Sequence, residues 1–390
     1  MNQSEAPSTI ALVAGEASGD QLGAALINAI RTQNPSIRFA GIGGPLMEAA
    51  GMECWWGTDQ LSIMGLFEVA QHVSRLMALR KQLVQRIIEL KPVVFIGIDA
   101  PDFNLGVEKR LKARGIRVIH YVSPTVWAWR PGRVKTIARA TERVLCLFPF
   151  EPAYYQQQPV KAEYCGHPLA DEIPLHVDVM PSRKALGIDI ATRCIALLPG
   201  SRLGEVEKLL GPMIDAAARL AKQYPDLCFI VPAATGLIGD FIESELRQYT
   251  ELNYRVFEGR GKEVIAAADV VICASGTATL EVMLINRPMV VCYRLAPMTY
   301  RMVKWFKLVK SRFFSLPNIL ASEKLVPELL QQEVEGERIA HEVSRWLDEP
   351  ERCTELNRRF NLLHQQLKTD AATTAATAVL QHIAPRNEPS

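Results

Sequence analysis

The stretch Ala196–Glu205, with the sequence ALLPGSRLGE, combines residue types that bind anions. The apolar run Cys194–Leu198 predicts a buried strand, Pro199-Gly200 ends it, and a helical pattern follows. A helix N-terminus after a glycine turn presents free N–H groups and a positive dipole end to phosphate, and the planar cation of Arg202 can donate two hydrogen bonds to it. An ordinary βα turn with a solvated arginine is the alternative interpretation.

A second stretch, Ala274–Glu281 (ASGTATLE), has the same order of elements. It follows the apolar run Asp269–Cys273 and places a Ser-Gly-Thr turn before a helix. Glu281 lies about one turn into that helix, where a carboxylate can accept hydrogen bonds from both hydroxyls of a ribose while the helix end binds phosphates. Two such helix starts in one half of the chain predict a site for a nucleoside diphosphate.

Polar side chains follow the first apolar run of the chain. Thr9–Ala14 predicts a buried parallel strand, and the turn after it carries Glu16, Ser18 and Asp20. Open α/β sheets bind ligands at the carboxyl ends of their strands, so these three side chains predict a site. Helix capping by Ser18 or Asp20 is the alternative interpretation.

Two more carboxylates follow the apolar run Val93–Ile98, which also predicts a buried strand. A partly desolvated carboxylate at the end of such a strand can act as a general base. We assign that chemistry to Asp99. We assign Asp102 mainly to structure, because it stands where it can cap the next helix.

The strand predicted at Arg117–Val122 ends in the sequence SPTVWAWR. Trp127 and Trp129 can form an apolar wall for a sugar or an acyl chain, and Arg130 can bind a phosphate. The alternative is that both tryptophans belong to the core.

Strands and helical patterns alternate along all 390 residues, which predicts an α/β protein with two domains. The glycine-rich stretch Arg38–Pro45 lacks the third glycine of the dinucleotide fingerprint at the required spacing, so nicotinamide binding is not expected. A segment rich in Asp, Pro and His marks an interdomain linker at 171–185, between domains at 1–170 and 186–345.

Composition excludes several classes of function. A formal net charge of +2 gives no general reason to expect nucleic-acid binding. The eight cysteines include no CxxC pair, so neither a zinc site nor a disulfide framework is expected. The N-terminal apolar run is too short for a signal peptide, and no apolar stretch reaches the roughly 18 residues of a membrane span, so we expect a cytoplasmic protein that is at most peripheral to a membrane.

Two segments are both basic and apolar. Leu61–Leu90 has a mostly helical pattern, and Tyr300–Phe314 interleaves basic with aromatic residues. Such segments bind an anionic membrane surface, which is the prediction for both. Their alternatives are a core helix with a solvated basic face and a surface helix with extended basic side chains.

Several longer motifs occur in order along the chain. They are Gly15-Glu-Ala-Ser-Gly-Asp20, Gly97-Ile-Asp-Ala-Pro-Asp-Phe103, His120-Tyr-Val-Ser-Pro-Thr-Val-Trp-Ala-Trp-Arg130, Leu197-Leu-Pro-Gly-Ser-Arg202, Ala274-Ser-Gly-Thr-Ala-Thr-Leu-Glu281 and Ser315-Leu-Pro-Asn318. Together they resemble the motifs of the bacterial lipid-A-disaccharide synthases. The resemblance runs from about Ile10 to the C-terminal helices.

The resemblance implies a GT-B glycosyltransferase of Gram-negative bacteria, with two Rossmann-like doubly wound domains facing across a cleft. The N-terminal domain takes the acceptor, the C-terminal domain binds the UDP-sugar, and a C-terminal helix at about 352–390 packs back on the first domain. The implied reaction transfers 2,3-diacylglucosamine from UDP to 2,3-diacylglucosamine 1-phosphate (lipid X), with inversion and without a metal or cofactor. The implied location of the protein is the inner face of the cytoplasmic membrane, and a homodimer is possible.

The resemblance also implies roles for individual residues. Asp99 is the expected base, with Glu16 or Asp20 as a rival or orienting group. Expected acceptor contacts are Ser18, Trp127 and Arg130. Expected donor contacts are Ser201, Arg202, Gly259, Ser275, Gly276, Thr277, Ala278, Glu281 and Asn318.

Two rival functions fit the same motifs. A UDP-sugar epimerase or hydrolase would share the nucleotide site but lack an acyl-accepting surface. A non-catalytic protein that binds a nucleotide sugar or a membrane would keep the glycine turns and could dispense with Asp99.

Overall fold

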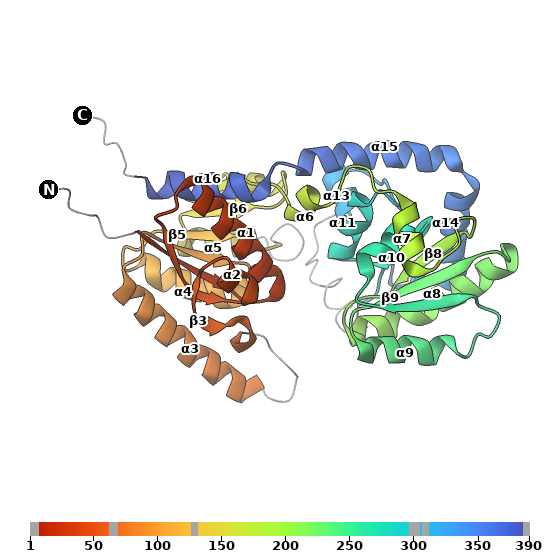
Figure 1. The fold of residues 1–390 in the computed structure, drawn as a ribbon, viewed down its shortest axis with the longest axis horizontal. Coiled ribbons are helices and arrows are strands. Elements are labelled where there is room, and N and C mark those ends of the chain that lie inside the picture. Colours follow the sequence, from red (N-terminus) through yellow and green to blue (C-terminus); the bar gives the residue numbers. More distant parts are fainter. Residues whose placement is uncertain (1–7, 62–68, 126–131, 296–304, 306–311, 385–390) are drawn as a thin grey trace. The chain divides into compact units, whose positions relative to one another are not determined.

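A computed structural model describes residues 8–61, 69–125, 132–295, 305 and 312–384. The chain forms two compact units, one made of Met1–Pro168 with Lys368–Ser390 and the other of Leu169–Leu367. Each unit contains a parallel sheet whose strands alternate with helices (Figure 1). The predicted α/β class is confirmed.

The first unit is built on seven parallel strands within the described residues. They are β1 (Thr9–Ala14), β2 (Arg38–Gly43), β3 (Glu53–Gly57), β4 (Val94–Ile98), β5 (Val118–Tyr121), β6 (Arg143–Cys146) and β7 (Lys161–Tyr164). Their order in the sheet is β3-β2-β1-β4-β5-β6-β7, so the chain reverses its direction across the sheet between β1 and β4. The central strands are apolar throughout, as expected for a sheet covered by helices on both faces.

The helices of the first unit cover both faces of that sheet. They are α1 (Ala17–Gln33), α2 (Pro45–Ala49), α3 (Val69–Leu90), α4 (Pro101–Lys112), α5 (Arg133–Ala140) and α16 (Ala371–Ile383). The last of these, α16, lies beside α1 although the two are far apart in the sequence (Figure 1). The guanidinium of Arg143 fixes it by donating to the Ala378 carbonyl at 2.6 Å.

The second unit repeats this plan with six parallel strands in its described part. They are β8 (Cys194–Leu198), β9 (Cys228–Ala233), β10 (Tyr254–Glu258), β11 (Val270–Ala274), β12 (Met289–Tyr293) and β13 (Glu328–Leu330). Their order is β10-β9-β8-β11-β12-β13, so the reversal falls between β8 and β11.

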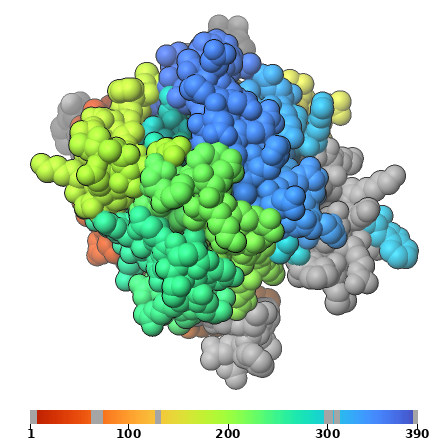
Figure 2. Space-filling view, turned by 90° about the vertical axis from the view of Figure 1, so that its right-hand side faces the viewer, coloured from red at the N-terminus to blue at the C-terminus, as the bar shows by residue number. Residues whose placement is uncertain are grey.

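The described part of the second unit contains more helices than that of the first. They are α6 (Pro168–Glu172), α7 (Val179–Leu186), α8 (Leu203–Gln223), α9 (Gly236–Leu246), α10 (Gly261–Ala267), α11 (Thr277–Leu284), α13 (Leu316–Ala321), α14 (Gly336–Asp348) and α15 (Pro350–Leu367). Figure 2 shows the blue surface of the C-terminal helices beside the green surface of α8, against which α14 packs. None of the helices within the described ranges is both long and apolar enough to span a bilayer.

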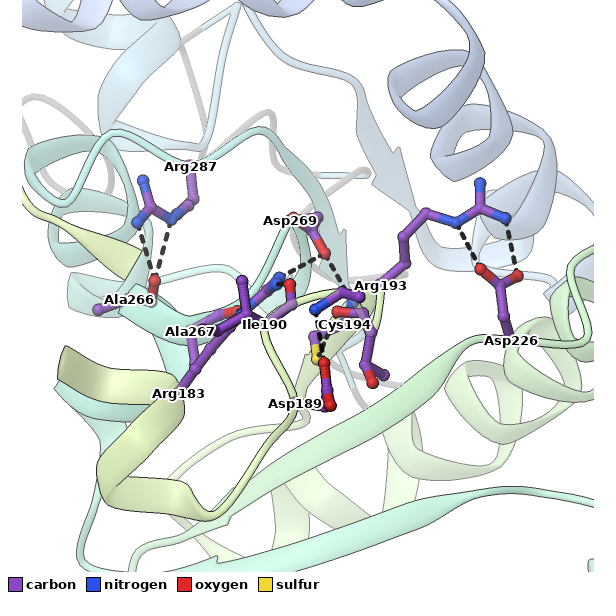
Figure 3. Close-up of polar contacts among 12 residues, drawn as sticks. Arg183, Asp189, Ile190, Arg193, Cys194, Asp226, Ala266, Ala267, Asp269 and Arg287 are labelled. Carbon is purple, nitrogen blue, oxygen red and sulfur yellow. Dashed lines mark hydrogen bonds and ion pairs between the residues drawn. The ribbon is translucent and has the colours of Figure 1, made fainter. Parts of the chain in front are cut away.

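The segment predicted as a linker, 171–185, is part of the second unit. It contains most of α7, and Arg183 of that helix is 6% exposed. Its guanidinium donates to the Ala267 carbonyl at 3.0 Å and to the Asp269 carboxylate at 2.8 Å (Figure 3). Arg287 donates to the Val177 carbonyl at 3.3 Å. These contacts tie the segment to the sheet, which its polar composition did not reveal.

The C-terminal segment predicted to pack on the first domain, 352–390, is divided between the units. Helix α15 belongs to the second unit, where Leu356, Phe360 and Leu363 are buried and the helix contacts α11 and α13. Only α16 belongs to the first unit. A short turn separates the two helices, and Asp370 caps α16 in the left-handed conformation (φ 55°).

We predict that the packing of α16 against the first unit is essential to the stability of that unit. Val379 is fully buried, so Val379→Asp would place an unpaired charge in the core and lower the free energy of unfolding by about 3 kcal/mol or more. Gln381 of the same helix is exposed, and Gln381→Asp is the matched control with little effect. Denaturant unfolding measures both. Equal losses in the two variants would contradict the packing of α16.

Candidate functional site

The turn after β4 holds Asp99 in an unusual backbone conformation. Asp99 (φ 49°) and Ala100 (φ 41°) are consecutive left-handed residues, and Val122, which follows β5, has φ 80°. Left-handed backbone costs an L-residue about 1–2 kcal/mol, and such residues gather at functional sites. The Asp99 side chain is half-buried, and no described residue forms a hydrogen bond or ion pair with its carboxylate.

The structure brings Glu16 and Ser18 to the same edge of the sheet as Asp99. Strands β1 and β4 are parallel neighbours, so the turns that follow them lie side by side. A Cβ atom at Gly15 would lie 2.6 Å from the Cβ atom of Ala100, so only glycine lets the two turns approach this closely. Glu16 and Ser18 are exposed there, and neither caps α1 with its side chain.

Asp20, predicted as a rival base, binds backbone N–H groups of the protein. Its side chain is 4% exposed. One carboxylate oxygen accepts from the backbone N–H groups of Gly44 and Met47, each at 2.9 Å, and the other accepts from Leu46 at 3.0 Å. Asp20 thus binds the free N–H groups at the start of α2, and both of its oxygens are engaged.

Three further predictions concern the loops of the first unit. Trp127 and Arg130 lie outside the described residues. Asp102 is 91% exposed on its side chain and forms an ion pair with Arg133; it does not cap α4, whose N-cap is Ala100.

A group of buried polar residues behind Asp99 was missed by the sequence analysis. The side-chain amide of Asn104 donates to the Asp99 carbonyl at 2.8 Å. One helical turn further along α4, a carboxylate oxygen of Glu108 lies 2.6 Å from Nδ1 of His120 on β5. Two signals in the sequence could have indicated this group: a histidine inside an apolar strand, and Gly97 inside another.

In the second unit, the turn between β8 and α8 exposes both predicted phosphate contacts. Ser201 and Arg202 are exposed, and Arg202 is the N-cap of α8 in an extended conformation. No described residue pairs with the Arg202 guanidinium. A Cβ atom at Gly200 would lie 2.8 Å from a carboxylate oxygen of Glu205, so this acidic side chain lies over the same turn and would have to share its positive potential with a bound phosphate.

The turn before α11 is open on its outer side. Gly276 has φ 145° and is exposed, and a Cβ atom there would meet no atom within 4 Å. Position 276 therefore requires glycine because of its backbone conformation, and not because a side chain would clash with neighbouring atoms. Thr277 is exposed and Ala278 is half-exposed in the first turn of the helix, so their N–H groups face an accessible surface.

Ser275 contacts a neighbouring loop of the protein. Its hydroxyl donates to the Phe314 carbonyl at 3.0 Å. The hydroxyl of Thr279 donates to the Gly276 carbonyl at 2.8 Å and accepts from the N–H group of Leu316 at 3.2 Å. These two side chains fasten the segment before α13 to the start of α11, and a contact of Ser275 with the donor stays a prediction.

Glu281 is a half-buried carboxylate in α11. Partial burial raises the pKa of its carboxyl, the positive charge of Lys262 lowers it, and the negative charge of Glu172 raises it. Lys262 forms its own ion pair with Glu172 at 3.2 Å. No described residue forms a hydrogen bond with the Glu281 carboxylate, so its oxygens are available to hydroxyl donors.

Asn318, predicted as a donor contact, bonds to backbone groups of the protein. It is fully buried, its amide nitrogen donates to the Val326 carbonyl at 3.0 Å, and its amide oxygen accepts from Leu325 and Val326. It therefore orders the loop that leads into β13. Gly259 is exposed at the end of β10 with φ 67°, so it remains a candidate contact.

Each unit thus offers different chemistry at the carboxyl edge of its sheet. The first presents exposed Glu16 and half-buried Asp99, which suit proton transfer. The second presents two helix N-termini, Arg202 and the half-buried Glu281, which suit a nucleoside diphosphate.

Solved structures share this fold at low sequence identity. UDP-GlcNAc 2-epimerase from Neisseria meningitidis, bound to UDP-GlcNAc, matches 96% of this chain and 100% of its own with a TM-score of 0.66 and 12% identity. MurG from Acinetobacter baumannii matches 96% of this chain and 100% of its own with a TM-score of 0.59 and 14% identity. The fold is that of the GT-B glycosyltransferases.

The model of one protein family, "Lipid-A-disaccharide synthetase", matches residues 10–380. Lipid-A-disaccharide synthase from Alcanivorax borkumensis is 46% identical over 97% of this chain and 98% of its own length. The enzyme of the same name from Alkalilimnicola ehrlichii is 49% identical over 95% of this chain and 97% of its own. The chain belongs to the lipid-A-disaccharide synthase family and is a glycosyltransferase of lipid A biosynthesis.

We predict that Glu281 lowers the stability of the second unit at neutral pH. Its raised pKa means that the fold favours the protonated carboxyl, so the penalty is present above that pKa and disappears as the pH falls toward the ordinary range, about pH 4. Glu281→Gln should raise the melting temperature at pH 7 and 8, with a gain that vanishes near pH 4. Glu207→Gln, at an exposed position of α8, is the control. A gain independent of pH would contradict the explanation.

Proposed function

We propose that this protein transfers 2,3-diacylglucosamine from UDP to the 6-hydroxyl of lipid X, forming a β-1,6-linked disaccharide 1-phosphate and UDP. The observation that carries the proposal is the strained turn at the edge of the first sheet, which holds a half-buried Asp99 whose carboxylate has no partner in the described part of the chain. Membership in the lipid-A-disaccharide synthase family supplies the substrate class.

Asp99 accepts the proton of the acceptor hydroxyl as the oxygen attacks the anomeric carbon of the donor from the face opposite UDP, which inverts that carbon. Glu16 is exposed on the adjacent turn and remains the rival or orienting group. UDP leaves with the bonding electron pair, and its diphosphate takes up the developing negative charge.

The second unit stabilises the departing UDP. The guanidinium of Arg202 and the N–H groups at the starts of α8 and α11 offset the charge of the diphosphate. Glu281 accepts hydrogen bonds from the ribose hydroxyls. These fixed positive groups let us propose a reaction that needs neither a metal ion nor a cofactor.

Acceptor-dependent UDP release tests the reaction and its base. Asp99→Asn removes the base without changing the size of the side chain, and we expect about a 10²–10⁴-fold loss of rate with donor binding intact. Asp102→Asn, three residues away at an exposed carboxylate, is the matched control and should keep the parent rate. EDTA should not change either rate.

Three outcomes would contradict parts of this proposal. Equal UDP release without acceptor would favour a hydrolase or epimerase. UDP binding without release would favour a binding protein. Loss of activity in EDTA that returns with a divalent cation would contradict the metal-independent mechanism.

We predict that Arg202→Ala lowers the rate by about 10²–10³-fold, because it removes a charge that stabilises the leaving group. Arg202→Lys should recover part of the loss, since it keeps the charge but not the paired hydrogen bonds. Arg219→Ala is the control on the same helix, where Arg219 is half-exposed and bonds only Asp215 among the described residues. Similar losses for Arg202→Ala and Arg219→Ala would contradict the assignment.

We also propose that the first unit binds the inner face of the cytoplasmic membrane through helices α3, α4 and α5. These helices pack side by side, and from Ser74 onward their exposed charges are mostly basic. The exposed basic residues are Arg75, Lys81, Arg86, Lys109, Arg110, Lys135 and Arg139, against the exposed acids Glu89 and Asp102. An anionic lipid surface attracts such a face. Most of Tyr300–Phe314, the other predicted membrane segment, lies outside the described residues.

Vesicle sedimentation tests the membrane surface. Each basic residue near an anionic surface contributes about 1 kcal/mol, so Lys109→Glu with Lys135→Glu should weaken binding to phosphatidylglycerol vesicles by roughly thirtyfold or more. Lys184→Glu with Lys324→Glu makes the same change of net charge at exposed positions of the second unit. If both double variants bind equally well, the proposed surface is wrong.

A further inference from the structure

Three polar side chains are completely buried behind the turn that carries Asp99. Asn104 and Glu108 lie one helical turn apart on α4, and His120 lies on β5; each is 0% exposed. Glu108 and His120 contact each other at 2.6 Å, while Asn104 bonds to the turn itself. Neither Glu108 nor His120 reaches the edge of the sheet where substrates are proposed to bind.

This arrangement is costly for folding. One atom of each side chain has no hydrogen-bond partner among the residues that the structure describes: the amide oxygen of Asn104, one carboxylate oxygen of Glu108 and Nε2 of His120. Buried polar atoms without partners destabilise a fold, and an apolar cluster of the same volume would be at least as stable. Glycine at position 97 also makes room for the Glu108 carboxylate. A Cβ atom at Gly97 would lie only 2.2 Å from it, so a larger residue would clash. Stability alone therefore does not account for it.

The group fixes both backbone polar groups of Asp99. Asn104 donates to the Asp99 carbonyl at 2.8 Å and to the Ile98 carbonyl at 3.2 Å, which fastens the turn to the end of β4. The N–H group of Asp99 donates to the Tyr121 carbonyl at 2.8 Å. Tyr121 follows His120 directly in β5. The contact between His120 and Glu108 therefore fixes the position of the strand whose carbonyl accepts the Asp99 N–H group.

We propose that Asn104, Glu108 and His120 are positioning residues for the transfer reaction: they hold Asp99 and Ala100 in the left-handed conformation and so fix the direction of the Asp99 carboxylate. This proposal rests on the proposed role of Asp99 as the base. It predicts a loss in the chemical step and none in the binding of either substrate, because the three residues do not touch a ligand.

Glu108→Gln is the first test, because it keeps the shape of the side chain and weakens its contact with His120. We expect kcat for acceptor-dependent UDP release to fall at least tenfold, with the KM values of both substrates within twofold of the parent. The matched control is Glu163→Gln. It alters another poorly exposed ion pair of the same unit, in which Glu163 lies 3.1 Å from Arg143, and it should leave kcat within twofold.

Ala100→Gly tests the same idea without removing a buried contact. Glycine adopts the left-handed conformation without strain, so the melting temperature should stay the same or rise. Glycine also admits many other conformations, so the direction of the neighbouring carboxylate is less fixed and kcat should again fall at least tenfold. A purely structural role of the turn predicts the opposite, a stable protein with the parent kcat. If Glu108→Gln does not fold, Ala100→Gly alone tests the positioning role.

Asp99→Asn separates this proposal from the one on which it rests. If Asp99→Asn is inactive while Glu108→Gln and Ala100→Gly keep the parent kcat, the positioning role is wrong and the base assignment stands. If Asp99→Asn keeps the parent rate, the base assignment fails, and the positioning role fails with it. A fall in kcat that is matched by Glu163→Gln would also overturn the positioning role, since it would reflect loosening of the whole unit.

Discussion

The reversal of strand order within each parallel sheet determines where this protein can do chemistry. Parallel strands all end at one edge, and at the reversal the connections leave toward opposite faces, which opens a crevice. The reversals fall between β1 and β4 and between β8 and β11. The turns after these four strands carry Glu16, Asp99, Arg202 and Gly276. Every proposed role in proton transfer or diphosphate binding therefore depends on two strand pairings.

The two carboxylates with proposed roles are expected to lower stability in different ways. Asp99 belongs to a pair of left-handed residues, so its cost lies in the backbone. Glu281 adopts an ordinary helical conformation, and its cost is the removal of water from a charged side chain. A strained turn fixes the direction of a carboxylate that must accept a proton. A desolvated carboxylate without a partner is ready to bond hydroxyl groups that bring their own donors.

The sequence predicts what depends on neighbouring residues and misses what depends on distant ones. Thr9–Ala14 and Cys194–Leu198 are strands over the ranges their apolar runs indicate. The contacts of Asp20 could not be predicted, because its partners, Gly44 to Met47, lie more than twenty residues away. Asn318 shows a different limit: its partners are seven and eight residues along the chain, but a loop gives no periodic pattern. The group around Glu108 is invisible until α4 and β5 are brought together.

The path of the chain also has a consequence for its synthesis. The first unit is interrupted by the whole of the second, and α16, which covers α1, comes from the last part of the sequence. While a ribosome makes residues 169–367, the face of α1 that α16 covers has no partner. The first unit can be completed only after α16 has left the ribosome. Messages cut short before α16 would yield chains with a complete second unit and an unfinished first one, which suits their removal by cellular proteases.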